Sequence, residues 1–78
     1  MLDSFQSTKH LLAENVKAKR KAKGLSQEAL ALEAQIDRTY ISQIERQICN
    51  PSLLILCSIA NVLECSVDVL LAECRLGA

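Results

Sequence analysis

Polar side chains of the kinds that hydrogen-bond DNA are concentrated between residues 38 and 46. Arginine donates to guanine O6 and N7, glutamine pairs with adenine, and the threonine methyl group contacts the thymine methyl. On a short helix, these side chains would project from its solvent-facing side. They are Arg38, Thr39, Ser42, Gln43 and Arg46. The chemistry they offer is base and phosphate recognition, although a polar helix face that contacts only water would carry the same residues.

A second short helix is predicted directly before this segment, over residues 27–34. Ser26 can cap its start, and Asp37 can cap the start of the following helix. Only about two residues, Gln35 and Ile36, separate the second helix from the cap of the third. A connection this short favours two helices packed near a right angle. One face of the second then stays free to enter a major groove.

Charge is distributed unevenly, although nine basic and nine acidic residues give a formal net charge of zero. Attraction to phosphate depends on the local patch more than on the total. We therefore expect Lys19 to contact phosphates, and Gln27, at a positive helix end, to contact another. An ordinary solvated helix face is the alternative. The basic residues that crowd together are Lys17, Lys19, Arg20, Lys21 and Lys23.

The remaining pattern predicts an all-α fold of five helices in one domain, residues 1–78. Its core covers about 8–75, after a short N-terminal extension. Gly24 is a natural stop for the first helix, and Asn50-Pro51-Ser52 interrupts the pattern before the fourth. The expected helices are Thr8 to Lys23, Gln27 to Ala34, Arg38 to Arg46, a fourth capped by Ser52 through Leu63, and Val67 to Arg75.

Neither a membrane-spanning run nor a secretory signal is present, which predicts a cytoplasmic protein without a membrane partner. The four cysteines form no C-x-x-C pair and His10 is the only histidine, so we expect no metal and no cofactor. Cys57 and Cys65 are expected to pack as small apolar groups. Cys49 and Cys74 are either incidental or redox-active.

Four short motifs occur in order along the chain: Arg20…Gly24-Leu25-Ser26-Gln27, the segment IDRTYISQIER, Asn50-Pro51-Ser52, and Ser66-Val67-Asp68. Together they make the stretch from about Val16 to Leu71 resemble the Cro/repressor-type (XRE, lambda-repressor-like) helix-turn-helix family. The DRTYIS stretch is especially similar to restriction–modification controller proteins and other small dimeric regulators. The resemblance implies a transcriptional regulator that binds operator DNA.

The resemblance also implies roles for particular residues. Arg20 and Glu45 match an internal ion pair that would tie the first helix to the recognition helix. Base-reading positions of the family match Arg38, Thr39 and Gln43. Positions that tend to touch the DNA backbone match Gln27, Tyr40, Arg46 and Asn50.

The chain departs from the family pattern at two positions. Gln35 and Gln47 stand where the family usually has glycine. A left-handed backbone at a non-glycine residue costs on the order of 1 kcal/mol. The local backbone after the second and third helices is therefore expected to carry strain.

Aliphatic residues of the fourth helix occupy more than one stripe, although one face would suffice for the core. We expect the surplus to form a two-fold homodimer interface through the fourth and fifth helices, and the homodimer to read a pseudo-palindromic operator. Scattered apolar surface residues are the alternative. The interface residues expected are Leu54, Ile55, Val69 and Leu76.

Two other classes of protein are alternatives to the regulator. An antitoxin-like interaction module, with DNA binding secondary, would use the same surplus of apolar residues. An enzyme is disfavoured because His10 has no evident catalytic partner and no glycine-rich loop could cradle phosphate. No separate ligand domain is evident, so no small-molecule ligand is expected.

Overall fold

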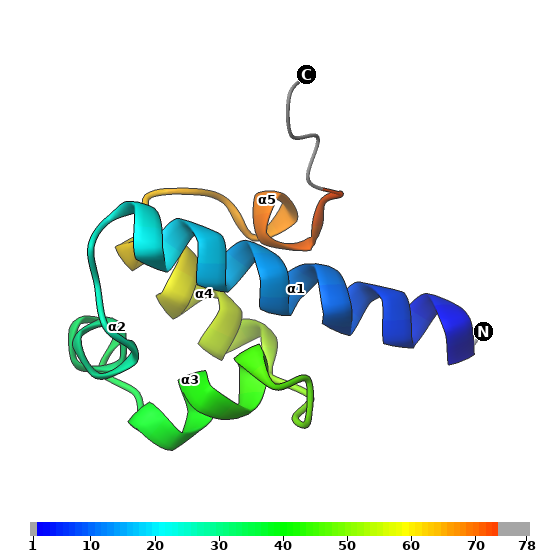
Figure 1. The fold of residues 1–78 in the computed structure, drawn as a ribbon, viewed down its shortest axis with the longest axis horizontal. Coiled ribbons are helices and arrows are strands. Elements are labelled where there is room, and N and C mark those ends of the chain that lie inside the picture. Colours follow the sequence, from blue (N-terminus) through cyan, green and yellow to red (C-terminus); the bar gives the residue numbers. More distant parts are fainter. Residues whose placement is uncertain (1, 74–78) are drawn as a thin grey trace.

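The structure is a computed structural model that describes residues 2–73, with side chains from Ser4 onward. All regular structure in this part of the chain is helical, which confirms the all-α prediction. Figure 1 shows α1 crossing the molecule, with α2 and α3 on one side and α5 on the other. The helices are α1 (Leu2–Ala22), α2 (Gln27–Ala34), α3 (Arg38–Glu45), α4 (Leu53–Val62) and α5 (Val67–Leu71).

The start of α1 differs from the prediction. The sequence predicts a short N-terminal extension and a helix from about Thr8, but the helix begins at Leu2. Thr8 does not cap a start, because its hydroxyl donates to the Ser4 carbonyl one turn earlier, at 2.8 Å. Lys9 lies over the Phe5 ring, 4.9 Å from its centroid, which adds a second contact between neighbouring turns. With no glycine or proline before Thr8, the helix extends back to Leu2.

The caps of α2, α3 and α4 form as predicted. The side chains of Ser26, Asp37 and Ser52 accept hydrogen bonds from backbone N–H groups in the first turns, at 2.9, 2.7 and 3.2 Å. They satisfy donors that would otherwise lack a partner. Ser66 makes no such side-chain bond at α5. The prediction that α5 extends to Arg75 was wrong, because the helix ends at Leu71 and the backbone of Ala72 is extended. Arg75 itself lies outside the described residues.

Four helices end in the same way. A residue one or two positions past each end has a positive φ: Gly24 (71°), Gln35 (60°), Gln47 (63°) and Glu64 (59°). The next N–H then donates to a carbonyl five residues back, at 2.9 to 3.0 Å, as at Ile36 and Ala31. This pattern is the Schellman motif, which glycine usually completes. The expected strain at Gln35 and Gln47 is therefore real, and Glu64 is a third such position that was not anticipated.

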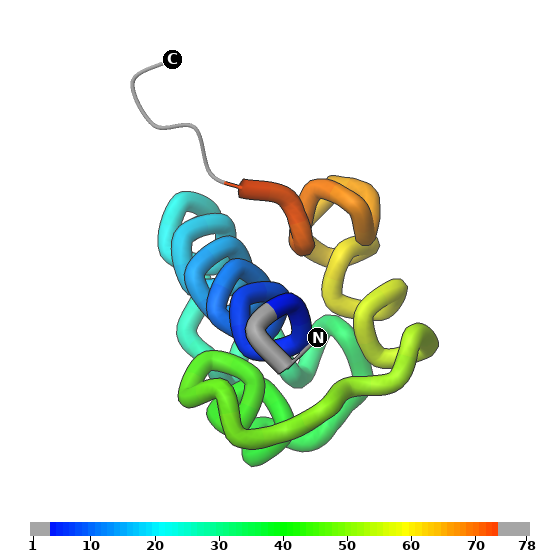
Figure 2. Tube along the Cα trace, turned by 90° about the vertical axis from the view of Figure 1, so that its right-hand side faces the viewer, coloured from blue at the N-terminus to red at the C-terminus, as the bar shows by residue number. Residues whose placement is uncertain are grey.

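An aliphatic core lies where the five helices meet. Figure 2, seen along α1, shows α3 below that helix and α4 and α5 beside it. Every helix contributes at least one fully buried side chain, and each is worth roughly 1.5–3 kcal/mol in transfer free energy. These side chains are Val16, Leu30, Ile41, Ile44, Ile59 and Leu70.

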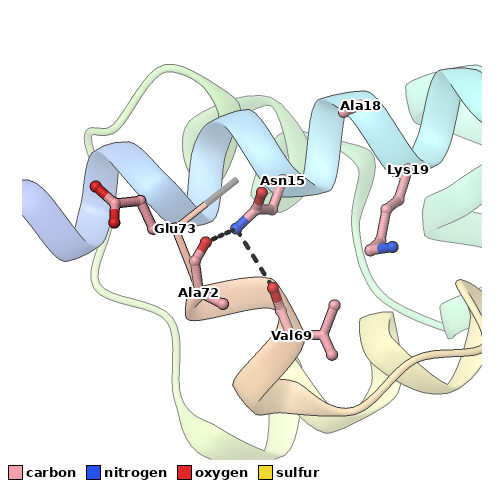
Figure 3. Close-up of a pocket in the computed structure, with 6 residues that line it drawn as sticks. All are labelled: Asn15, Ala18, Lys19, Val69, Ala72 and Glu73. Carbon is pink, nitrogen blue, oxygen red and sulfur yellow. Dashed lines mark hydrogen bonds between the residues drawn. The ribbon is translucent and has the colours of Figure 1, made fainter. Parts of the chain in front are cut away.

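Asn15 holds the carboxyl end of α5 against α1. Its buried amide donates to the carbonyls of Leu70 at 2.8 Å and Ala72 at 2.7 Å, with a longer contact of 3.4 Å to Val69. Figure 3 shows the amide pointing from α1 toward the last turn of α5, where a shallow pocket opens between the two helices. The last carbonyls of a helix lack intrahelical partners, and here the Ala72 N–H reaches only the Val69 carbonyl, at 3.3 Å. One buried side chain therefore completes the end of α5.

The cysteines are only partly as predicted. Cys57 is exposed on α4, so the prediction that it packs in the core was wrong. Cys65 is half-buried, and burial raises the pKa of its thiol. Cys49 is also half-buried with a raised pKa, and Cys74 lies outside the described residues. Among the helices described, none is both long and apolar enough to cross a membrane.

Candidate DNA-binding site

The two short helices α2 and α3 are joined by Gln35, Ile36 and Asp37 and pack against each other. The buried side of α3 carries Ile41 and Ile44, whose side chains are in the core. With these two residues inside, the opposite side of α3 must face solvent. The sequence prediction of a short connected pair with one free face is confirmed.

The free face of α3 presents the polar side chains that were expected there. Arg38, Thr39 and Arg46 are exposed, while Ser42 and Gln43 are half-buried. No side-chain hydrogen bond or ion pair within residues 4–73 engages Arg38, Gln43 or Arg46. Their donors therefore remain available to a ligand outside the molecule.

A buried ion pair fixes α3 to α1. Arg20 Nε donates to Glu45 Oε2 at 2.7 Å, and Arg20 Nη2 donates to Glu45 Oε1 at 3.0 Å. Arg20 Nη1 also donates to the Leu25 carbonyl at 2.9 Å, between α1 and α2. The side chains of Arg20 and Glu45 are only 10% and 4% exposed. The predicted pair is thus present, with the two-pronged geometry that gives arginine–carboxylate pairs their directionality.

Glu45 also connects α3 to the beginning of α2. Gln27 Nε2 donates to Glu45 Oε1 at 3.0 Å. Burial alone would raise the pKa of Glu45, but the hydrogen bonds from Arg20 and Gln27 and the charges of Arg20 and Lys17 hold it below the ordinary value. Glu45 is therefore ionised at neutral pH and anchors three helices through one carboxylate.

The other expected backbone-contacting residues lie around this face. Gln27 is half-buried at the start of α2, with its amide directed to Glu45. Tyr40 is half-buried and packs against the core. Asn50 is exposed in the connection between α3 and α4. The structure thus brings Gln27, Tyr40 and Arg46 onto or beside the α2–α3 pair, and Asn50 to the segment that follows it.

Lys19 is not brought to this site. It lines the pocket between α1 and α5 together with Val69 and Ala72, as Figure 3 shows. The lysine of α1 whose charge acts on Glu45 is Lys17. The basic cluster was interpreted as one patch, but its members are distributed around α1. The spacing of these lysines from Arg20 indicates different faces, because successive residues of an α-helix are rotated by about 100°.

Apolar side chains on α4 and α5 form a second surface. Leu54 is 76% exposed and Val69 is 38% exposed, whereas Ile55 is half-buried against the core. Leu53, which was not predicted, is 68% exposed beside Leu54. Leu76 lies outside the described residues. Two adjacent exposed leucines at the start of a helix are the most prominent apolar feature of this surface.

The two short helices α2 and α3 are joined by a tight turn, and α3 has one buried face and one free polar face. This is the arrangement of a DNA-binding domain of the helix-turn-helix class. The helix-turn-helix family model matches residues 16–70, and the chain belongs to that family. It is therefore a DNA-binding transcriptional regulator.

Individual relatives agree with this assignment. The chain is 43% identical over 69 residues to the control protein C.SmaI of Serratia marcescens, a match that covers 88% of this chain and 82% of that protein. The restriction-modification controller protein C.AhdI from Aeromonas hydrophila superposes with a TM-score of 0.76 at 34% identity, covering 80% of this chain and 94% of the other. The structure of SinR, the master regulator for biofilm formation, in complex with DNA matches with a TM-score of 0.75 at 39% identity, covering 78% and 98%.

Proposed function

We propose that the chain binds a pseudo-palindromic operator as a homodimer, with α3 in the major groove of each half-site. The observation that carries this proposal is the face of α3, on which the side chains of Arg38 and Gln43 form no hydrogen bond or ion pair with residues 4–73, while Thr39 is exposed and its side chain hydrogen-bonds Asp37. A side chain that is not engaged elsewhere can form base contacts without first breaking an internal bond. Arg38 suits guanine, Gln43 suits adenine, and Thr39 suits a thymine methyl group, with Ser42 between them.

Phosphate contacts would hold α3 in register. Arg46 and Asn50 extend from the end of α3 and the segment after it, and Tyr40 lies at the edge of the free face. Gln27 adds the positive end of α2. If each subunit neutralises roughly three phosphates, log K should fall against log salt concentration with a slope near −5.

We propose that a second copy of the chain binds at the apolar surface of α4 and α5. Leu54 and Val69 are the proposed interface residues, and we add Leu53, which is exposed beside Leu54. One recognition helix offers few base contacts, whereas two helices about 34 Å apart would read half-sites one helical turn apart. The controller protein C.AhdI, which has a similar fold, is a small regulator with which this proposal can be compared.

The same exposed leucines support a second candidate, an antitoxin-like module whose α4 surface would bind a different protein. Size-exclusion chromatography of the protein alone separates the two functions, because a stable homodimer that buries Leu54 leaves little of this surface for another partner. We assign no enzymatic activity, cofactor or small-molecule ligand to the chain. We propose that it acts as one domain in the cytoplasm.

The test begins with selection of bound sequences from random DNA, followed by titration of Arg38→Ala on the selected operator. The variant should lose 1–3 kcal/mol of specific binding, about five- to 150-fold, and relax the preference at one base position. Glu33→Ala, a change of an exposed residue on α2, is the matched control and should bind as the wild type does. Equal losses for operator and random DNA in Arg38→Ala would refute the assigned base contact.

A further inference from the structure

We propose that Lys17, on α1, contacts a DNA phosphate at the edge of each half-site. The inference rests on the proposed docking of α3, because it adds a contact to that same interface. It replaces Lys19, which the sequence had suggested, with a lysine on the opposite side of the helix. The position of Lys17 follows from the register of α1 and from the contacts that its neighbours make.

Successive residues of an α-helix are rotated by about 100°, which places the basic side chains of α1 on different faces. Lys17 is about 60° from Arg20, whose guanidinium binds Glu45 of α3. Lys19 is about 200° from Lys17. On that opposite face, Asn15 binds the end of α5 and Lys19 lines the same pocket.

Two further contacts indicate that Lys17 lies on the side of α1 next to α3 and that Lys23 lies next to the end of α4. His10 is seven residues before Lys17, within about 20° of it around the helix, and His10 Nδ1 lies 3.3 Å from Nε2 of Gln47 at the end of α3. The α1 face that carries His10 and Lys17 therefore runs along α3. Lys23, in contrast, pairs with Glu64 beyond the end of α4, at 2.9 Å.

Lys17 stands beside the point where two DNA-contacting elements converge. Glu45, in the last turn of α3, accepts a hydrogen bond from Gln27 at the beginning of α2. The positive end of α2 and the exposed Arg46 flank this junction. A phosphate held by these groups would lie next to Lys17, whose charge would add to theirs.

The ammonium of Lys17 is free to make such a contact. Both oxygens of Glu45 are already occupied, by Arg20 and by Gln27. Lys17 is half-buried, and within residues 4–73 its side chain makes no hydrogen bond or ion pair. Half-buried lysine side chains commonly pack their stems on the protein and keep the charged end in solvent, and we infer this arrangement for Lys17.

The experiment compares Lys17→Gln with the matched control Lys19→Gln, each titrated with operator and with random DNA over roughly 50–200 mM salt. For Lys17→Gln we expect weaker binding to both DNAs alike and a salt slope shallower by about 0.9 per subunit. Lys19→Gln should keep the wild-type slope. Lys17→Arg, which preserves the charge, should restore it.

Other outcomes would overturn the inference. An unchanged slope in Lys17→Gln, or equal losses in both glutamine variants, would remove Lys17 from the interface. A loss of operator binding alone, with random DNA unaffected, would mean that Lys17 only positions Glu45. Arg38→Ala in the same series tests the docking separately: if it loses base discrimination while Lys17→Gln behaves as the wild type does, only the phosphate contact fails.

Discussion

The guanidinium of Arg20 and the carboxylate of Glu45 meet through two parallel hydrogen bonds of 2.7 and 3.0 Å, buried between α1 and α3. Both charges are largely shielded from water, so each depends on the other for stabilisation. The net contribution of such a pair to stability is small, because desolvation offsets the attraction. Its value lies in orientation, since it aligns the recognition helix with the longest helix of the domain.

Removing one partner of this pair should destabilise the fold severely. Arg20→Met leaves the Glu45 carboxylate buried without its main counter-charge, and the expected loss is about 3–5 kcal/mol in the free energy of unfolding. Urea denaturation followed by circular dichroism measures it. The double variant Arg20→Met, Glu45→Met should lose much less than the two single variants together, because no lone charge remains. Additive losses would show that the pair is not energetically coupled.

The free energy of unfolding should decrease in acid because Glu45 becomes protonated. The pKa of this carboxyl is lower in the folded protein than in the unfolded chain. Its contribution is therefore complete above the ordinary glutamate pKa of about 4.3 and is lost as the pH falls through the folded value.

Denaturation of the wild type and Glu45→Gln between about pH 3 and 7 tests this. The difference in stability between the two should shrink as the pH decreases. Asp37 and Glu64 also have lowered pKa values, but they are present in both proteins and cancel in the difference. A difference that stays constant with pH would contradict the role of Glu45.

Glycine at residue 35 should stabilise the domain. Gln35 has φ 60°, and a left-handed backbone is strained for any residue with a Cβ. Gln35→Gly is expected to gain about 1 kcal/mol, which raises Tm by roughly 4–8 °C in a domain of this size. Differential scanning calorimetry measures the shift. Ala29→Gly, inside α2, is the control and should lower Tm, because there glycine only adds flexibility to the unfolded chain.

Self-association should depend on Leu54. Leu54→Glu places a charge in the proposed interface and should yield a monomer in analytical ultracentrifugation, with operator affinity reduced toward that of a half-site. Leu32→Glu offers a close control, because Leu32 on α2 is 78% exposed and Leu54 is 76% exposed. The control should dimerise normally. A Leu54→Glu variant that remains dimeric would move the interface elsewhere.

Local signals in the sequence were sufficient for much of the fold. Ser26, Asp37 and Ser52 marked helix starts because a cap requires a short side-chain oxygen at a defined position. Ile41 and Ile44 fixed the buried side of α3 and hence its free face. The Arg20–Glu45 pair was anticipated only through family resemblance, since no local rule connects residues so distant in sequence.

Other features depended on tertiary structure or on competing local preferences. Thr8 is suited to a cap, yet the chain before it continues the helix. The basic run on α1 divides between faces, so Lys19 lies by α5. Glu64 adopts a left-handed backbone although nothing in its residue type favours it. Cys57 was assigned to the core from its apolar character, but α4 turns that position outward.

The hold of Asn15 on the end of α5 has a practical consequence for engineering. Because this amide fixes Ala72 beside the face of α1 that is turned away from α3, a fusion that replaces the residues after Glu73 would start on the far side of the molecule from α3. A fluorescent reporter or an effector module attached there would leave the free face of α3 accessible. Attachment before α1 would instead extend a helix whose His10 side runs along α3, and such fusions are the ones expected to obstruct the operator.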